Sequence, residues 1–93
     1  MPDAYRRLDL NLLRVFDAVM AERSLTRAAE KLSLTQPAVS NALRRLRDTL
    51  GDELVRRSST GVEPTARAQA LWPVVQSALG QLEGALTPQA FEP

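Results

Sequence analysis

The sequence predicts a mainly α-helical domain that carries one small β-hairpin and ends in a long helix. Apolar residues recur at spacings of three and four over most of the first 50 positions, which indicates packed helices. Two short runs that favour strands flank the turn-forming residues 58–61. A further apolar stripe then continues over residues 66–86, which is longer than any helix predicted before it.

The composition argues against an enzyme. The 93 residues include no Cys and no His, which excludes disulfides, Cys or His nucleophiles, imidazole bases and ordinary zinc sites. A chain of this length also forms a core too small to enclose a substrate cavity easily. The sequence contains no Gly-rich phosphate loop and no cluster of metal ligands. We therefore expect no catalytic residue, no metal and no cofactor in this part of the protein.

Positive charge is concentrated in the first two thirds of the chain. The net charge is only +1, but all twelve Lys and Arg lie at or before Arg67. Nine Asp and Glu share that part, which leaves it at +3 and permits a nucleic-acid partner. The start lacks the apolar run of a signal peptide, and residues 68–86 contain too many polar side chains for a membrane span. We expect a cytoplasmic protein without a membrane partner.

The first 23 residues predict a leader and a supporting helix. Residues 1–8 have the character of a loose leader in which Arg6 and Arg7 are solvated, with a contact to phosphates as the alternative. Asp9 is a suitable N-cap for a helix over residues 10–23. The apolar stripe of this helix consists of Leu12, Val15, Phe16, Val19 and Met20.

A second, short helix and a tight turn follow. Ser24 caps a helix over residues 25–32. The short side chains of Ala28 and Ala29 would let another helix cross closely, as in a helix-turn-helix. Ser33 occupies the turn, where Gly is common because the backbone often has a positive φ, so a serine implies either slight strain or a somewhat different turn. The inward side chains of this helix are expected to be Leu25, Ala28, Ala29 and Leu32.

The third helix, over residues 35–50, is where we place the function. Leu34 is expected to pack into the core, after which Thr35 caps the helix and Pro37 fits its first turn. Gly51 ends it. One face is apolar and consists of Val39, Leu43, Leu46 and Leu50. The other face is rich in hydrogen-bond donors suited to base edges and phosphates, and consists of Gln36, Pro37, Ser40, Asn41, Arg44 and Arg47.

The next residues predict a β-hairpin, or wing. Short extended runs at Leu54–Arg57 and Val62–Pro64 are separated by the turn residues Ser58–Gly61. Leu54 and Val62 are expected to hold this wing to the helical core, because they are its inward apolar side chains.

Thr65 caps the last helix, over residues 66–86. A core of three helices cannot cover so long an apolar stripe, so its distal half needs a partner, and a second copy of the same helix is the economical one. The chain therefore divides into a domain at residues 1–65, a linker helix at 66–86 and a hinge at 87–93. The predicted homodimer interface consists of Leu71, Val75, Leu79, Leu82 and Leu86.

These residues resemble a known family. The segments LNLLRVFDAVMAERSLTRAAEKLS and TQPAVSNALRRLR, with a wing ending in PTARA, are similar to the N-terminal DNA-binding domain of LysR-type transcriptional regulators. The resemblance covers roughly residues 8–86, and in the family this part is a winged helix-turn-helix followed by a dimerising linker helix. DLNLL and QPAVSNALRRLR are similar to the branch of nodulation and aromatic-catabolism activators and a leucine-operon-linked regulator.

The resemblance implies sequence-specific binding of double-stranded DNA by a bacterial transcriptional regulator. Helix 35–50 would enter the major groove, the wing would contact the backbone or the minor groove, and a homodimer would bind an inverted repeat. Arg44 is the strongest single candidate, because Arg pairs with guanine through two hydrogen bonds. The DNA-binding residues so implied are Thr26, Arg27, Thr35, Gln36, Pro37, Ser40, Asn41, Arg44, Arg45, Arg57 and Ser58.

The resemblance also concerns the rest of the protein. Full-length members of the family carry a C-terminal domain that senses a small-molecule effector, so we expect this chain to be an isolated DNA-binding fragment, with a naturally short protein as the alternative. The resemblance also allows a tetramer of the full-length protein and a contact of that protein with RNA polymerase.

Several alternatives stay open at this stage. The domain could bind a polypeptide, with the linker helix docked on a protein partner, whereas RNA binding is disfavoured because no aromatic residue is placed to stack on bases. Arg44 could be a solvated side chain paired with Asp48. Arg45 and Arg47 are equally explained as surface charges. We expect Trp72 to pack between the linker helix and the domain.

Overall fold

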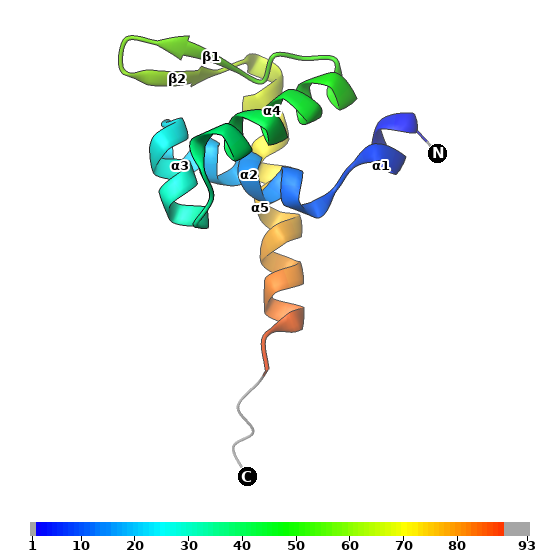
Figure 1. Cartoon of the computed structure of the whole chain (residues 1–93). Coiled ribbons are helices and arrows are strands. Elements are labelled where there is room, and N and C mark those ends of the chain that lie inside the picture. Colours follow the sequence, from blue (N-terminus) through cyan, green and yellow to red (C-terminus); the bar gives the residue numbers. More distant parts are fainter. Residues whose placement is uncertain (1, 89–93) are drawn as a thin grey trace.

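The computed structural model describes residues 2–88, which form five helices and one two-stranded antiparallel hairpin (Figure 1). The predicted mainly α-helical fold with a wing and a long last helix is confirmed. The elements are α1 Asp3–Arg7, α2 Leu10–Glu22, α3 Leu25–Leu32, α4 Gln36–Leu50, β1 Val55–Ser58, β2 Gly61–Pro64 and α5 Ala66–Leu86.

The predicted caps determine where the helices begin. The Asp9 carboxylate accepts a hydrogen bond of 2.8 Å from the Asn11 N–H at the start of α2. Ser24 Oγ and Thr35 Oγ1 each accept one of 3.2 Å, from Arg27 N–H and Ala38 N–H respectively. Each cap satisfies a first-turn N–H that has no partner within its helix.

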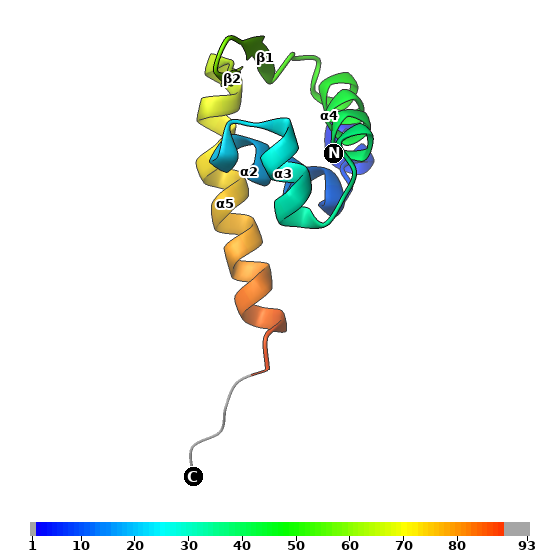
Figure 2. The ribbon, with the colours of Figure 1, turned by 60° about the vertical axis from the view of Figure 1, so that its left-hand side comes forward.

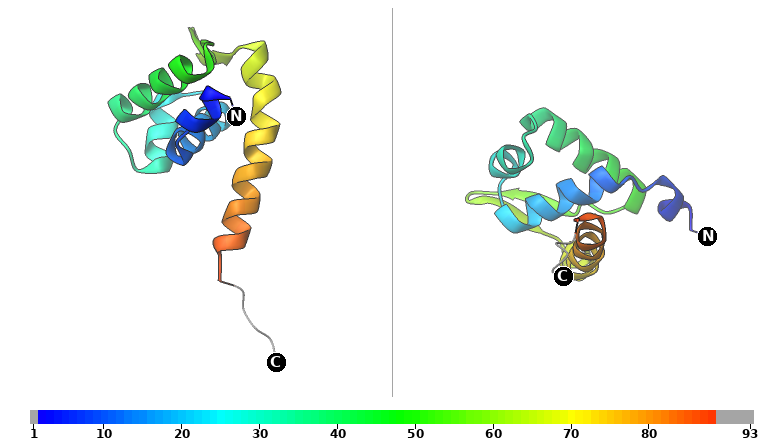
Figure 3. Two further views of the ribbon diagram at one scale, coloured as in Figure 1. Left: turned by 90° about the vertical axis from the view of Figure 1, so that its right-hand side faces the viewer. Right: turned by 90° about the horizontal axis from the view of Figure 1, so that it is seen from below.

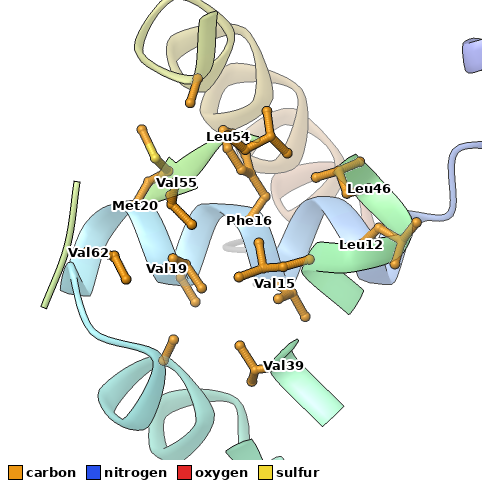
Figure 4. Packing of buried hydrophobic residues seen from close by; sticks show 14 of the residues in the cluster. Leu12, Val15, Phe16, Val19, Met20, Val39, Leu46, Leu54, Val55 and Val62 are labelled. Atoms are coloured by element: carbon orange, nitrogen blue, oxygen red, sulfur yellow. The ribbon is translucent and has the colours of Figure 1, made fainter. Parts of the chain in front are cut away.

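Helix α2 is the centre of the hydrophobic core. Figure 4 shows its side chains packed between α4 on one side and the base of the wing on the other. Phe16 and Val19 of α2, Val39 and Leu46 of α4 and Leu54 at the wing have no exposed surface. In the described part of the chain no polar or charged side chain is buried, so this core is held by apolar packing alone.

The predicted loose leader is wrong for its middle residues, because Asp3–Arg7 form the short helix α1. The pattern of charges favours a helical turn here. Asp3 lies in the first turn and Arg7 in the last, where they complement the helix dipole. Their side chains also form an ion pair of 3.3 Å at i, i+4 spacing. Arg6 and Arg7 are both exposed, as expected.

The turn between α3 and α4 differs from the prediction at one residue. Of the two alternatives for Ser33 the structure has the strained one, with a positive φ of 57° that an L residue adopts at a cost. Leu34, expected in the core, is 44% exposed instead. Its N–H donates to the Ala29 carbonyl over 2.9 Å, and this bond carries the backbone past the end of α3 with the side chain at the surface.

The wing begins one residue later than predicted. Leu54 has a φ of 64°, which lies outside the extended region, so β1 starts at Val55 and pairs with Pro64 of β2. β2 starts one residue early, at Gly61, which pairs with Ser58. The expected anchors are confirmed, since Leu54 is fully buried and Val62 is 6% exposed.

Helix α5 starts and ends where the sequence places it and packs against α2 and β2. Its first half belongs to the core, with Ala68 and Val75 buried. Its second half projects beyond the other helices (Figure 3). The first half of the predicted linker helix thus packs with the domain, and residues 89–93 of the predicted hinge lie outside the described residues.

Candidate nucleic-acid interface

The polar face of α4 is open to solvent along the helix. Val39, Leu43 and Leu46 are buried against α2, which fixes the orientation of the opposite face. That face has no carboxylate before Asp48, so it presents donors and positive charge together. Ser40 and Arg47 of this face are half-buried, and its other members are exposed: Gln36, Pro37, Asn41 and Arg44.

A groove of about 240 Å³ lies where α3, α4 and the wing meet. It brings together four of the predicted DNA-binding residues from three elements that are distant in sequence. They are Thr26 of α3, Gln36 of α4, and Arg57 and Ser58 of β1. Figure 2 shows the wing at one end of the molecule, with α3 and α4 below it. Gln36 belongs to the polar face of α4 as well as to the lining of this groove.

Gly61 determines how closely the wing lies against the end of α2. The Val62 N–H donates a hydrogen bond of 3.2 Å to the carbonyl of Arg23. A Cβ on Gly61 would lie 2.2 Å from that carbonyl oxygen, and its φ of 135° also suits glycine alone. Arg23 itself has a φ of 54° as the C-cap of α2. Gly61 thus lets the wing approach closely enough to form the groove.

A smaller cleft of about 170 Å³ separates the wing from the middle of α4. Ser40 and Arg47 line it from α4, and Arg57 lines it from β1. Arg57 therefore borders both openings. Arg56, the neighbouring arginine on the same strand, lines neither of them.

Arg44 is paired within the polar face of α4. Its guanidinium donates a hydrogen bond to Oδ1 of Asn41, one turn earlier, and not to Asp48 as the alternative interpretation had it. The two side chains therefore form one exposed unit of amide and guanidinium. This pairing orients the Arg44 guanidinium alongside the amide of Asn41.

Arg47 of α4 and Arg56 of β1 both bind Glu53. Arg47 Nε donates to the Glu53 carbonyl over 2.8 Å, and Arg56 Nε donates to the Glu53 carboxylate over 2.7 Å. The hydrogen bond to Glu53 also raises the pKa of Arg56. These arginines connect the end of α4 to the base of the wing, whereas Arg45 is an exposed side chain on α4.

The remaining predicted residues lie at the N-terminal ends of α3 and α4. Thr26 and Arg27 are exposed in the first turn of α3, and the Arg27 N–H is already bound by Ser24 Oγ. Thr35 is exposed, and its hydroxyl caps α4. Thr26 and Gln36, at the starts of the two helices, line the same groove of about 240 Å³. Helix dipoles favour an anion at such ends.

The predicted interface residues on α5 divide into two groups. Val75 is 4% exposed, and Leu71 and Leu79 pack partly against the same core, so less of this stripe is free for a partner than its apolar pattern indicates. Leu82 is 44% exposed and Leu86 is 77% exposed. The apolar stripe left open by the domain is therefore the distal half of the helix.

These distal leucines form one wall of a groove of about 370 Å³. The opposite wall comes from α2 and the end of α3, with Leu10, 47% exposed, at its rim. Charged side chains of both signs surround it, among them Arg14 and Glu83.

Two carboxylates that organise α5 were not singled out by the sequence analysis. Asp17 accepts a hydrogen bond from the Trp72 indole, and Asp52 accepts one from the Thr65 hydroxyl. Hydrogen bonds from the Leu54 N–H and from Thr65 hold the pKa of Asp52 below its ordinary value. No local sequence signal marks either residue, because each partner lies on a different element. The packing of Trp72 between α5 and the domain is confirmed.

Residues 2–88 contain no group of acidic side chains arranged to hold a metal ion. Within the same range, no helix combines the length and the apolar character that a bilayer crossing requires.

The chain matches the family described as the bacterial regulatory helix-turn-helix protein, lysR family, over residues 10–69. It is 51% identical over 88 residues to the HTH-type transcriptional regulator LeuO of Escherichia coli and 52% identical over 75 residues to the nodulation protein D 1 of Rhizobium meliloti. These matches cover 95% and 81% of this chain but only 28% and 24% of the relatives. The chain thus spans less than a third of the length of the relatives it matches.

Solved structures agree with the sequence matches. A probable transcriptional regulator from Pseudomonas aeruginosa superimposes with a TM-score of 0.87 at 43% identity, over 94% of this chain and 30% of that one. The BenM DNA-binding domain in complex with catB site 1 DNA superimposes with a TM-score of 0.80 at 32% identity, over 85% of this chain and 89% of that one. The comparisons agree with the expected branch and with a regulator rather than an enzyme.

Proposed function

The chain belongs to the lysR family of bacterial regulatory helix-turn-helix proteins, and from this premise we propose that it binds double-stranded DNA in a sequence-specific manner as a homodimer. One observation carries the proposal. The groove at α3, α4 and the wing gathers Thr26, Gln36, Arg57 and Ser58 beside the open polar face of α4. Donors on three elements would then contact one duplex at the same time.

In this proposal α4 lies in the major groove. Gln36, Asn41 and Arg44 offer amide and guanidinium groups to base edges, while Pro37 offers an apolar surface to a thymine methyl group. Ser40 and Arg45 lie farther along the helix and contact bases or the adjacent backbone. The small number of base-reading side chains explains why one copy alone would give limited specificity.

Phosphate contacts hold the helix in register. Thr26 and Arg27 at the start of α3 and Thr35 at the start of α4 lie where helix dipoles favour phosphate. Arg57 and Ser58 extend the contact from the wing to the backbone or the minor groove. These contacts supply affinity that depends on salt rather than on sequence.

A second copy would bind through the distal half of α5. Leu82 and Leu86 are the open apolar residues there, with Leu79 and Leu71 completing the stripe toward the domain. Val75 supports this face from inside the core. A two-fold arrangement of two such chains places two α4 helices on an inverted repeat.

The intact protein is a bacterial transcriptional regulator in this proposal. It acts in the cytoplasm, and a further domain binds a small-molecule effector. A tetramer and a contact with RNA polymerase belong to that intact protein. The family membership and the short share of each relative that this chain covers support this interpretation.

A titration at several salt concentrations separates DNA binding from the alternative of a protein-interaction module. The probe is a duplex selected by the chain from a random-sequence pool, with a scrambled duplex as control. We expect affinity for the selected duplex to fall steeply as salt rises, because bound phosphates release counterions. Equal binding to both duplexes, or no binding to either, would contradict the proposal and favour a polypeptide partner.

A further inference from the structure

A polar joint connects three elements at one end of the molecule. Asp52 Oδ2 accepts hydrogen bonds of 2.8 Å from the Leu54 N–H and from the Thr65 hydroxyl. Thr65 is the N-cap of α5, and its hydroxyl oxygen accepts from the Ala68 N–H over 3.1 Å. One carboxylate thus binds the base of the wing and the start of the linker helix at once. We call these residues, with Leu50 and Arg67, the Asp52 joint.

The joint also includes the end of α4. Arg67, in the first turn of α5, donates from Nη1 to the Leu50 carbonyl over 2.5 Å. That carbonyl lies in the last turn of α4, where helical carbonyls lack partners within the helix. A cation from α5 therefore caps the helix that carries the base-reading side chains.

The backbone at the joint is held in a conformation that it would not adopt alone. Leu54 is fully buried with a φ of 64°, in the left-handed region that is unfavourable for a branched side chain. The Thr65 N–H donates to the Leu54 carbonyl over 2.8 Å, and Asp52 binds the Leu54 N–H. Both polar groups of this residue are thus fixed by the joint.

We propose that Asp52 and Thr65 are positioning residues, which set the angle between α4 and α5 and thereby the distance between the two α4 helices of a dimer. This inference rests on the proposed function. The two copies would meet at the distal half of α5, far from the joint. A small change of the angle between α4 and α5 at the joint would therefore shift each α4 by a large distance relative to the other copy. A palindrome of one spacing is then bound best.

The alternative role for Thr65 is to cap α5 and nothing more. Two substitutions distinguish these roles. Thr65→Asp keeps a good N-cap but replaces the hydroxyl donor by a second carboxylate facing Asp52. Thr65→Ser keeps both the cap and the donor. A capping role predicts that both variants behave like wild type, whereas a positioning role predicts that only the serine variant does.

A reciprocal exchange tests the contact itself. In the double variant Asp52→Asn with Thr65→Asp, the new amide can donate to the new carboxylate and restore a connection with the direction of donation reversed. If the double variant recovers the spacing preference, the contact between residues 52 and 65 is responsible for it, and not the effect of either substitution alone.

The measurement is the affinity of the 93-residue chain for each of three duplexes. The first is the palindrome selected by the wild-type chain, and the other two have one base pair added or removed at the centre. Circular dichroism and analytical ultracentrifugation confirm that each variant is folded and dimeric. We expect the affinity of Thr65→Asp for the selected palindrome to fall about tenfold, which corresponds in free energy to roughly one hydrogen bond to a charged group. We also expect this variant to lose most of its spacing preference.

The variants are expected to differ in their preference for one palindrome spacing. Wild type and Thr65→Ser prefer one spacing, Thr65→Asp does not, and the double variant regains the preference. If Thr65→Asp does not fold, Asp52→Asn alone is compared, and it should show a smaller loss of preference. Folded variants that keep the wild-type spacing preference would overturn the inference while leaving the proposed function intact. A wild-type chain without any spacing preference would overturn both.

Discussion

The indole Nε1 of Trp72 in α5 donates a hydrogen bond of 2.9 Å to Oδ1 of Asp17 in α2. The two residues lie 55 positions apart, and both side chains are half-buried. Trp72 also packs against the hydrophobic core. This bond therefore holds the linker helix α5 on the central helix α2. Neither residue belongs to the surface of α3, α4 and the wing that we assign to DNA.

Trp72→Phe should destabilise the domain, because the ring keeps most of its packing but loses its donor. We expect the free energy of unfolding to fall by about 1–2 kcal/mol in urea denaturation. Asp17→Asn keeps an acceptor and serves as the matched control, with a smaller loss. In a double-mutant cycle with Asp17→Ala, purely additive effects would show that the hydrogen bond contributes nothing.

Gly61→Ala should displace the wing. The added methyl group would meet the Arg23 carbonyl oxygen at 2.2 Å, and the positive φ disfavours any side chain. We expect a loss of stability greater than about 1 kcal/mol, together with weaker DNA binding, since Arg57 and Ser58 would leave the groove. Gly84→Ala, where a Cβ meets nothing within 4 Å, should not destabilise the fold. Equal behaviour of the two variants would refute the role assigned to Gly61.

Arg44→Ala should weaken binding to the selected duplex by about 1–3 kcal/mol and relax the preference for it over a scrambled duplex. The reason is the loss of a guanidinium that can pair with guanine through two hydrogen bonds. Lys31→Ala is the control, because it also removes one positive charge, but from the end of α3 beside Glu22. Unchanged affinity and unchanged preference in Arg44→Ala would show that α4 does not bind bases as proposed.

Leu86→Glu should give monomers without unfolding the domain. Leu86 is 77% exposed, so a carboxylate there costs the isolated chain little, but it would be desolvated in an apolar dimer interface. Analytical ultracentrifugation should show the lower mass, and the palindrome should be bound much less tightly while a half-site is bound as before. Ser77→Glu places the same charge on the opposite side of α5 and should stay dimeric. A dimeric Leu86→Glu would require another interface.

The contribution of Asp52 to stability should depend on pH. Its pKa in the folded chain lies below its ordinary value of 3.8, because the Leu54 N–H and the Thr65 hydroxyl bind the carboxylate. The stabilisation by the ionised carboxylate is therefore complete above the ordinary pKa of 3.8, and it is lost as the pH falls through the lower pKa that Asp52 has in the folded chain. Urea denaturation of wild type and Asp52→Ala should show a difference that shrinks in acid. A difference independent of pH would mean that the charge is not involved.

Local sequence determined most of the elements. Asp9, Ser24, Thr35 and Thr65 are side-chain caps whose hydrogen bonds span two or three residues, so their effect can be deduced from spacing alone. The same holds for the buried stripe of α2 and for the polar face of α4, since helical periodicity fixes which side chains share a face.

Only the tertiary structure decided which apolar residues are covered and which polar groups meet. Leu34 looks like a core residue in sequence but is exposed because of the turn that precedes it, while Val75 is buried in the hydrophobic core. The contacts of Asp17 with Trp72 and of Asp52 with Thr65 join elements through space and leave no periodic trace. Burial and polar contacts at long range depend on how helices cross, and this crossing is settled by the packing of the whole domain.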